Sequence, residues 1–245
     1  MRIFKIMLPG LGIMVSALFY LSCSKDHGKN VAPLEEDFNN SALVQVFNAT
    51  VSSTRTYIYV DGVPVTGATL TYGNVFPGGG AFAFKVKGGL RAFLIKDTLL
   101  TSTQAQIAFS ENFQSGQGKT YTIFMYDTTT IAKQLTVENT MVIPSDTTAR
   151  LKFANFIYNS GGTPAVDVFS VKKNANLFTN VSKTQVTDFI PYASGVSDTL
   201  LVRETGTTNL LASLNSFNAT LKRSYTIIYR GSFKGTRALS AFPNN

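Results

Sequence analysis

Apolar and polar residues alternate with a period of two along much of the chain beyond residue 40. The clearest alternation covers residues 43–47, 57–60, 82–86, 121–125 and 225–229. Successive side chains of a β-strand point to opposite faces, so this pattern predicts strands with one buried face. No stretch beyond the N-terminal segment sustains the apolar spacing of an amphipathic helix. The chain is therefore predicted to be all-β.

Turn residues separate these strands at short intervals. Asp61-Gly62 lies between residues 57–60 and 63–65, and this is the residue pair that a tight primed hairpin turn requires. Gly88-Gly89 lies between residues 82–87 and 90–96 and predicts a second hairpin. Short strands joined in this way are typical of antiparallel β-sandwiches.

The two halves of the chain repeat one another. Residues 43–48 align with residues 150–155 at an offset of 107, and each segment ends in asparagine. Residues 119–124 align with residues 223–228 at an offset of 104. Solenoid repeats have periods of about 20–50 residues, so a unit this long predicts tandem domains. We expect two antiparallel β-sandwich domains, residues 41–143 and 149–245, joined by the linker 143–148.

The N-terminal segment predicts export and lipidation. Arg2 and Lys5 precede an apolar stretch, residues 6–20, which is the pattern of a removable export signal. Ser22-Cys23 resembles the lipobox of bacterial lipoproteins, although Tyr20 stands where that motif usually has leucine. The resemblance implies a signal peptide over residues 1–22 and a lipid anchor on Cys23. The alternatives are an uncleaved signal anchor and a secreted protein with a chance cysteine.

Residues 23–40 are polar, charged and without periodicity, which predicts a flexible tether. The opening Cys-Ser-Lys-Asp resembles lipoproteins of the Bacteroidetes type, in which such charges favour export to the outer face. This implies a protein of the cell envelope, anchored in the outer membrane and displayed at the cell surface. The alternative is a solvated linker that carries no targeting signal.

Composition excludes several kinds of chemistry. Cys23 and His27 are the single cysteine and the single histidine, so the folded part can hold neither a disulfide nor a histidine-dependent catalytic triad or zinc site. Six of the ten acids beyond the tether are Asp61, Asp97, Glu111, Asp167, Asp188 and Glu204. Their spacing identifies no catalytic pair. Residues 116–120 look superficially like a phosphate loop, but an alternating strand follows them instead of a helix. We therefore expect no enzyme activity, no cofactor and no metal.

Two weaker signals point to binding and modification. Between residues 205 and 245 there are five basic residues and no acid, which predicts a face for an anionic ligand or, alternatively, ordinary solubilising charge. These are Lys222, Arg223, Arg230, Lys234 and Arg237. Asp-Thr dipeptides resemble the O-glycosylation sequon of exported Bacteroidetes proteins, although threonine is common enough here for chance to supply several. The candidate threonines are Thr98, Thr128, Thr147 and Thr199.

The strand and turn motifs together resemble a known family. They are the opening strands that end in asparagine, the turn 60–62, the segment 70–73 and the closing Tyr-Thr strands. They resemble the paired β-domains of bacterial cell-envelope lipoproteins of domain-of-unknown-function family 4397, over residues 40–235. The resemblance implies an immunoglobulin-like or transthyretin-like sandwich and no chemistry. In the second unit, the Asp-Gly turn that should follow residues 166–168 is missing.

These observations predict a non-catalytic envelope lipoprotein. Its sandwiches would bind a glycan or an envelope protein, or act as a structural spacer, because a rigid scaffold can present variable loops. The main alternative is an accessory subunit of a larger envelope complex, with an enzyme third. An exported, tethered protein is not expected to bind nucleic acid.

Overall fold

The computed structural model describes residues 39–53, 56–78, 82–96, 107–140 and 143–244, which all belong to one compact unit. These residues form β-strands and no helix, which confirms the all-β prediction. The strands are β1 (Ser41–Asn48), β2 (Tyr57–Val60), β3 (Val63–Pro64), β4 (Val75–Phe76), β5 (Phe84–Lys87), β6 (Gly89–Lys96), β7 (Ile107–Phe113), β8 (Thr120–Tyr126), β9 (Lys133–Asn139), β10 (Ala149–Tyr158), β11 (Val166–Ser170), β12 (Ala175–Val181), β13 (Ile190–Tyr192), β14 (Ser197–Glu204), β15 (Leu210–Asn218), β16 (Ser224–Ser232) and β17 (Arg237–Pro243).

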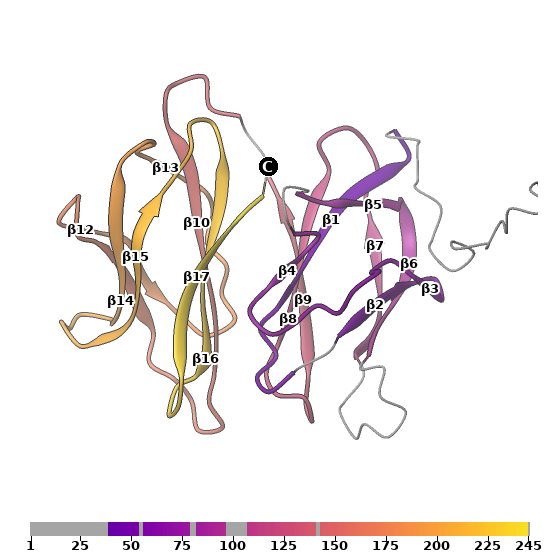
Figure 1. Ribbon diagram of the computed structural model, residues 1–245, viewed down its shortest axis with the longest axis horizontal. Coiled ribbons are helices and arrows are strands. Elements are labelled where there is room, and N and C mark those ends of the chain that lie inside the picture. The colour runs from indigo at the N-terminus through magenta and orange to yellow at the C-terminus, as the bar shows by residue number, and fades with distance from the viewer. Residues whose placement is uncertain (1–38, 54–55, 79–81, 97–106, 141–142, 245) are drawn as a thin grey trace, which may run out of the picture. The chain divides into compact units, whose positions relative to one another are not determined.

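The strands form four sheets, two in each half of the chain. In the N-terminal half (residues 41–140) the inner sheet has the order β4-β1-β8-β9, with β5 also paired to β1, and the outer sheet has the order β3-β2-β6-β7. In the C-terminal half (residues 143–244) the inner sheet is β13-β10-β16-β17 and the outer sheet is β12-β11-β14-β15 (Figure 1). Each inner sheet packs on its own outer sheet around a separate apolar core.

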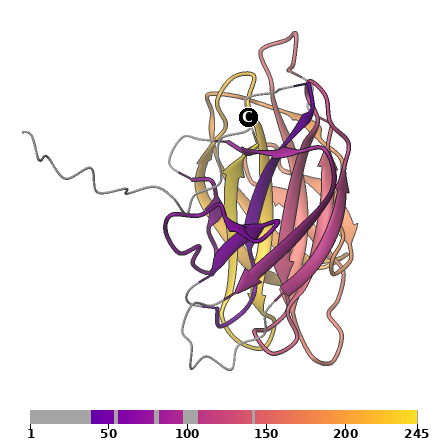
Figure 2. The ribbon, with the colours of Figure 1, turned by 90° about the vertical axis from the view of Figure 1, so that its right-hand side faces the viewer.

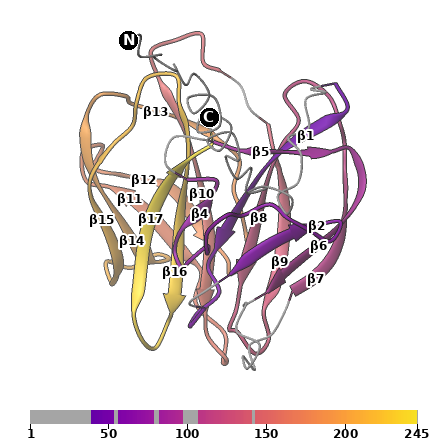
Figure 3. The ribbon, with the colours of Figure 1, turned by 45° about the vertical axis from the view of Figure 1, so that its right-hand side comes forward.

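The two inner sheets also pack against each other. Their central strands are buried almost continuously, as in β1 and β10, because both faces of each strand are covered. One face contributes to the core of its own half. The other contributes to a third apolar cluster, here called the junction core, in which both halves take part. Figures 1 and 3 show this order of layers, outer–inner–inner–outer. Figure 2 looks along the stack, with the strands of the N-terminal half in front of those of the C-terminal half. The buried members of the junction core are Phe47, Ala49, Phe124, Ala154, Phe156, Ile228 and Phe242.

The strand pairing follows the same pattern in each half. In each half the first strand pairs in parallel with the second-to-last strand, β1 with β8 and β10 with β16, whereas the other pairings are antiparallel. Leu43 lies opposite Thr120, and Arg150 lies opposite Ser224. The offsets of 107 and 104 relate these two pairs to each other. The repeat therefore gives a residue-by-residue correspondence between the inner sheets.

One predicted hairpin is present and the other is not. Asp61 and Gly62 have φ of 50° and 81°, and Val60 lies opposite Val63, as a primed two-residue turn requires. The hairpin predicted at Gly88-Gly89 is wrong, because β5 pairs with β1 of the inner sheet while β6 pairs with β2 and β7 of the outer sheet. The chain crosses between sheets here. Gly88 permits the crossing, since a Cβ at this position would overlap the side chain of Ser115.

Equivalent polar side chains brace each half. Asn48 and Asn155 are fully buried, and the Oδ1 atom of each accepts the backbone N–H two residues further on. Their Nδ2 groups donate to the carbonyl oxygens of Leu70 and Val181, at 3.3 and 3.0 Å. β1 ends at Asn48, whereas the prediction that the second opening strand ends in asparagine is wrong, because β10 continues past Asn155 to Tyr158. In both strands the asparagine amide satisfies buried backbone groups.

Candidate functional site at the junction of the two halves

Two small polar clusters accompany the junction core. In the first, Asn139 Nδ2 donates to Thr122 Oγ1 at 2.9 Å, and Lys152 Nζ donates to Asn139 Oδ1. In the second, Thr226 Oγ1 donates to Asn244 Oδ1 at 2.8 Å, and Asn244 Nδ2 donates to Gln45 Oε1 at 3.0 Å. Each cluster joins a residue of one half to a residue of the other.

These clusters are equivalent under the repeat. The offset of 107 relates Gln45 to Lys152, and the offset of 104 relates Thr122 to Thr226. Asn139 lies opposite Thr120, and Asn244 bonds to the backbone of the equivalent Ser224. The contact of Gln45 with Asn244 thus has a counterpart, with the halves exchanged, in the contact of Lys152 with Asn139. Reciprocal contacts of this kind define an isologous interface, as in a two-fold symmetric dimer.

The symmetry fails at the lysine. Gln45 is neutral, whereas its equivalent Lys152 carries an amine that is buried, with 2% of the residue exposed. Burial lowers the pKa of Lys152 to about 7, and the charge of Asp188 acts in the opposite direction. Nζ lies 5.0 Å from the ring centroid of Phe189, and among the described residues its hydrogen-bond partner is Asn139.

A pocket of about 350 Å³, here called the Lys152 pocket, lies beside this amine. Both halves form its wall, through the end of β9, the start of β10 and the segment 186–189. Two basic and two acidic side chains line it together with an aromatic ring, so its charges are mixed. The lining residues are Val137, Glu138, Thr140, Arg150, Lys152, Val186, Thr187, Asp188, Phe189 and Ser224.

The equivalent region on the other side of the junction has different chemistry. Leu43 takes the place of Arg150 there. Phe82 takes the place of Asp188, because each lies two residues before the strand, β5 or β13, that pairs with the opening strand of its half. The resulting hollow of about 740 Å³, here called the apolar groove, is lined mainly by apolar atoms. Arg223 lies over the ring of Phe82 at 4.6 Å. The groove is lined by Leu43, Phe82, Ala83, Gly118, Thr120, Ile143, Leu221, Lys222, Arg223 and Asn244.

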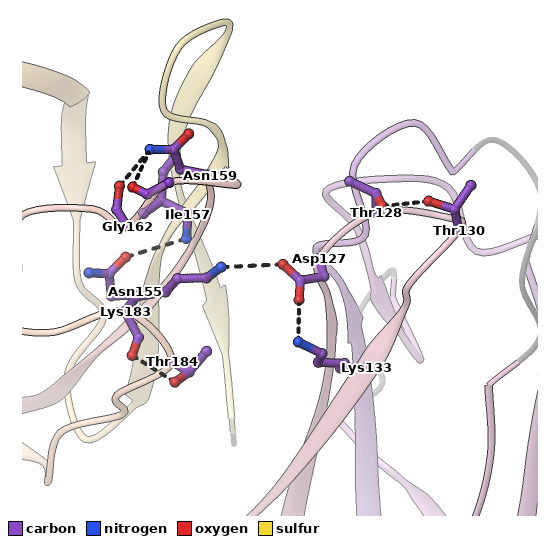
Figure 4. A network of polar contacts seen from close by, with 11 residues as sticks. Asp127, Thr128, Thr130, Lys133, Asn155, Ile157, Asn159, Gly162, Lys183 and Thr184 are labelled. Carbon is purple, nitrogen blue, oxygen red and sulfur yellow. Dashed lines mark hydrogen bonds and ion pairs between the residues drawn. The ribbon is translucent and has the colours of Figure 1, made fainter.

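A buried carboxylate provides a further contact between the halves. Asp127, at the end of β8, is 3% exposed and lies 2.9 Å from Lys133 and 3.3 Å from Lys183 of the C-terminal half (Figure 4). The hydrogen bond from Lys133 to this carboxylate raises the pKa of the lysine. The lysine side chains are 59% and 28% exposed, so the carboxylate is the buried member of each pair. Lys183 thus provides a charged contact from the C-terminal half to the N-terminal half.

The five predicted basic residues fall into two groups. Lys222 and Arg223 precede β16, whereas Arg230, Lys234 and Arg237 lie at its other end. Nine residues of strand span about 30 Å, so the two groups do not share one small ligand site. Arg230 packs over the ring of Tyr72 at 4.6 Å and donates to Ser240, and it is therefore engaged in structure.

The other predicted residues are scattered. Thr147 is exposed, and Thr128 and Thr199 are half-buried. Cys23, Thr98, residues 1–22 and the tether up to residue 38 lie outside the described residues. No group of three or more histidine, cysteine, aspartate or glutamate side chains within the described ranges could hold a metal ion.

Two of the carboxylates considered in the sequence analysis, those of Asp167 and Asp61, make contacts that stabilise the fold. Burial alone would raise the pKa of Asp167, but hydrogen bonds from Asn180, Gly206, Thr205 and Asn176 lower it overall. Asp61 pairs with Arg91 at 3.0 Å beside its hairpin. Asp97 lies outside the described residues. The residue that the sequence reasoning missed is Lys152, whose signal was a charge between the apolar residues Leu151 and Phe153 of β10.

A scan against protein-family models finds no matching family, and a search of curated proteins finds no match. Across the described ranges, no helix has the length and apolar character needed to cross a membrane.

Proposed function

We propose that this protein is a non-catalytic lipoprotein of the bacterial cell envelope that serves as a binding or structural module. The observation that supports this best is the junction core. Apolar side chains from both halves pack there as they do in a protein interior, with Phe124 and Phe156 stacked at 4.7 Å between ring centroids. Two halves joined in this way keep their loops at fixed relative positions, which suits a module that presents a surface to a glycan or an envelope protein.

The proposed anchor is a lipid on Cys23, followed by the tether 23–40. A fully extended chain spans at most about 3.6 Å per residue, so this tether would reach roughly 60 Å from the membrane. That distance would carry the folded part clear of the membrane surface. Multiple acyl chains would make the attachment stable, because each buried methylene contributes about 0.8 kcal/mol.

Cell fractionation with surface proteolysis tests this proposal. The native chain is expected in the membrane fraction, and external protease should remove its folded part from whole cells. A Cys23→Ser variant keeps the fold and loses the lipid acceptor, so it should leave the membrane fraction. If the Cys23→Ser variant stays in the membrane, the lipid anchor is wrong. Protection of the native chain from protease would instead refute surface display.

The apolar groove supports a second candidate function, an accessory subunit of an envelope complex. Ile143 and Leu221 are 69% and 47% exposed there, and Lys222 and Arg223 lie beside them. These features fit a protein segment with apolar residues flanked by acids. A photo-crosslinking residue at position 221 should then capture one acidic-flanked peptide in intact cells. The same residue at Val171, which is 50% exposed, is the matched control, and equal crosslinking from both positions would refute a specific partner.

A further inference from the structure

The Lys152 pocket differs from its symmetry mate in a way that stability does not require. At the equivalent position Gln45 bridges the junction with a neutral amide, which accepts from Asn244 Nδ2 at 3.0 Å and donates to the carbonyl oxygen of Pro243 at 2.9 Å. Burying a lysine amine opposite a single amide oxygen is costlier, because the charged form loses its hydration without gaining a charged partner. The fold therefore shows that a glutamine can close this junction, and that the C-terminal half instead places an amine beside a pocket.

We propose that the Lys152 pocket binds a small aldehyde, which is held as an imine on Lys152 Nζ. The proposal stands on the pocket that both halves enclose and on the buried amine in its wall. It goes beyond the proposed role as an envelope module, because it assigns a ligand class to one defined site.

The lining favours an aldehyde over an anion. Glu138 and Asp188 line the pocket and would repel an anion. Apart from Lys152, Arg150 is the one basic side chain in the lining that could offset them. Glu138 also pairs with Lys119 at 2.7 Å, which holds its side chain in place. Because the pKa of Lys152 is about 7, roughly half of the amine is uncharged at neutral pH. Desolvated lysines of this kind are the ones that form imines with carbonyl compounds.

The chemistry needs no further reagent. The lone pair of neutral Nζ adds to the carbonyl carbon, and the carbonyl oxygen takes up a proton to give a carbinolamine. The nitrogen then loses its protons while the hydroxyl group leaves as water, so that amine and aldehyde give imine and one water molecule. Water can exchange these protons, and Asp188 adds a carboxylate to the wall of the same pocket.

The size of the pocket limits the ligand. A volume of about 350 Å³ lies at the lower end of the range for ligand pockets. Hydroxyl-bearing residues, Thr140 and Ser224, stand in the wall with the ring of Phe189. A short hydroxyaldehyde fits this combination of polar and apolar lining.

Reductive trapping tests the proposal on the full chain. Glycolaldehyde with cyanoborohydride at pH 7 is expected to give a reduced adduct on Lys152, located by peptide mass mapping. The yield there should exceed that on the exposed Lys234 at least ~10-fold, because an ordinary lysine is protonated at this pH. The yield on Lys152 should rise as the pH passes through 7.

The matched control is Lys152→Gln, which carries the residue of the symmetry mate. It should lose this one adduct, retain the adducts on exposed lysines and melt at or above the temperature of the native chain. The proposal is wrong if Lys152 is labelled no more than Lys234 in the native chain, a comparison that depends on no variant. It is also wrong if acetate saturates the site and glycolaldehyde leaves Lys152 unmodified, since the pocket would then be an anion site.

Discussion

Truncation of Phe124 to alanine tests whether the two halves form one body. Phe124 is fully buried but faces away from the core of its own half, and it belongs to the junction core. Its ring stacks on Phe156 at 4.7 Å and lies 6.5 and 6.4 Å from Phe47 and Phe242. If the halves did not pack together, this side chain would be exposed to solvent.

The expected cost follows from that burial. Replacing a fully buried phenylalanine by alanine lowers the free energy of unfolding by about 3–5 kcal/mol, through lost transfer free energy and the cavity left behind. The same substitution at an exposed site changes stability by about 0.5 kcal/mol or less. The two arrangements therefore differ by several kcal/mol at one residue.

Urea unfolding followed by circular dichroism measures the difference. Leu90→Ala is the control, because Leu90 is 68% exposed on the outer sheet and its loss should be nearly neutral. We expect Phe124→Ala to lower the midpoint strongly and Leu90→Ala to leave it unchanged. A loss below about 1 kcal/mol for Phe124→Ala would refute the packed junction.

Three further predictions concern single residues. Gly73→Ala should lower the melting temperature, because Gly73 has φ of 82° and a Cβ there would lie 2.5 Å from Arg230 Nη2. Backbone strain of this kind costs about 1–3 kcal/mol, so an unchanged melting curve would contradict the prediction. Asn48→Ala should destabilise the fold by about 1–3 kcal/mol in urea unfolding, because it leaves buried backbone groups without partners, whereas a neutral effect would show that water replaces the amide. Lys152→Gln should stabilise the protein most at and below pH 7 and progressively less as the pH rises toward 10, because the pKa of Lys152 is about 7 in the folded state and higher in the unfolded state. If the difference in stability between variant and native chain does not vary between pH 6 and pH 10, burial does not lower the pKa of this lysine.

The sequence predicts those features of the fold that depend on local patterns. Period-two alternation identifies the strands, and Asp61-Gly62 specifies its hairpin because few residue pairs tolerate positive φ at both positions. The repeat offsets predict the correspondence between β1 and β10 and between β8 and β16. These predictions succeed because each rests on residues that are close together or on direct similarity.

The predictions that were wrong concern pairing between strands that lie far apart in the sequence. Gly88-Gly89 has the composition of a hairpin turn, but the strand before it finds its partner in β1 and the strand after it in β2 and β7. Alternation tells which face is buried and not which sheet a strand joins. The parallel pairing within each half and the junction core likewise arise only when both inner sheets are in place.

The candidate site shows the same limit. Lys152 looks like an outward-facing charge when β10 is taken as a half-buried strand, yet the junction covers that face as well. Its significance comes from comparison with Gln45, and that comparison requires the register of both inner sheets. The basic residues of the last 40 positions were grouped by sequence, but β16 separates them along its length.

The most direct test of the proposed function is the intact mass of the protein extracted from membranes. We expect a chain that begins at Cys23 and carries the additional mass of acyl groups, with residues 1–22 removed. A chain that retains residues 1–22, or one that begins beyond Cys23 without acyl groups, would contradict the envelope lipoprotein.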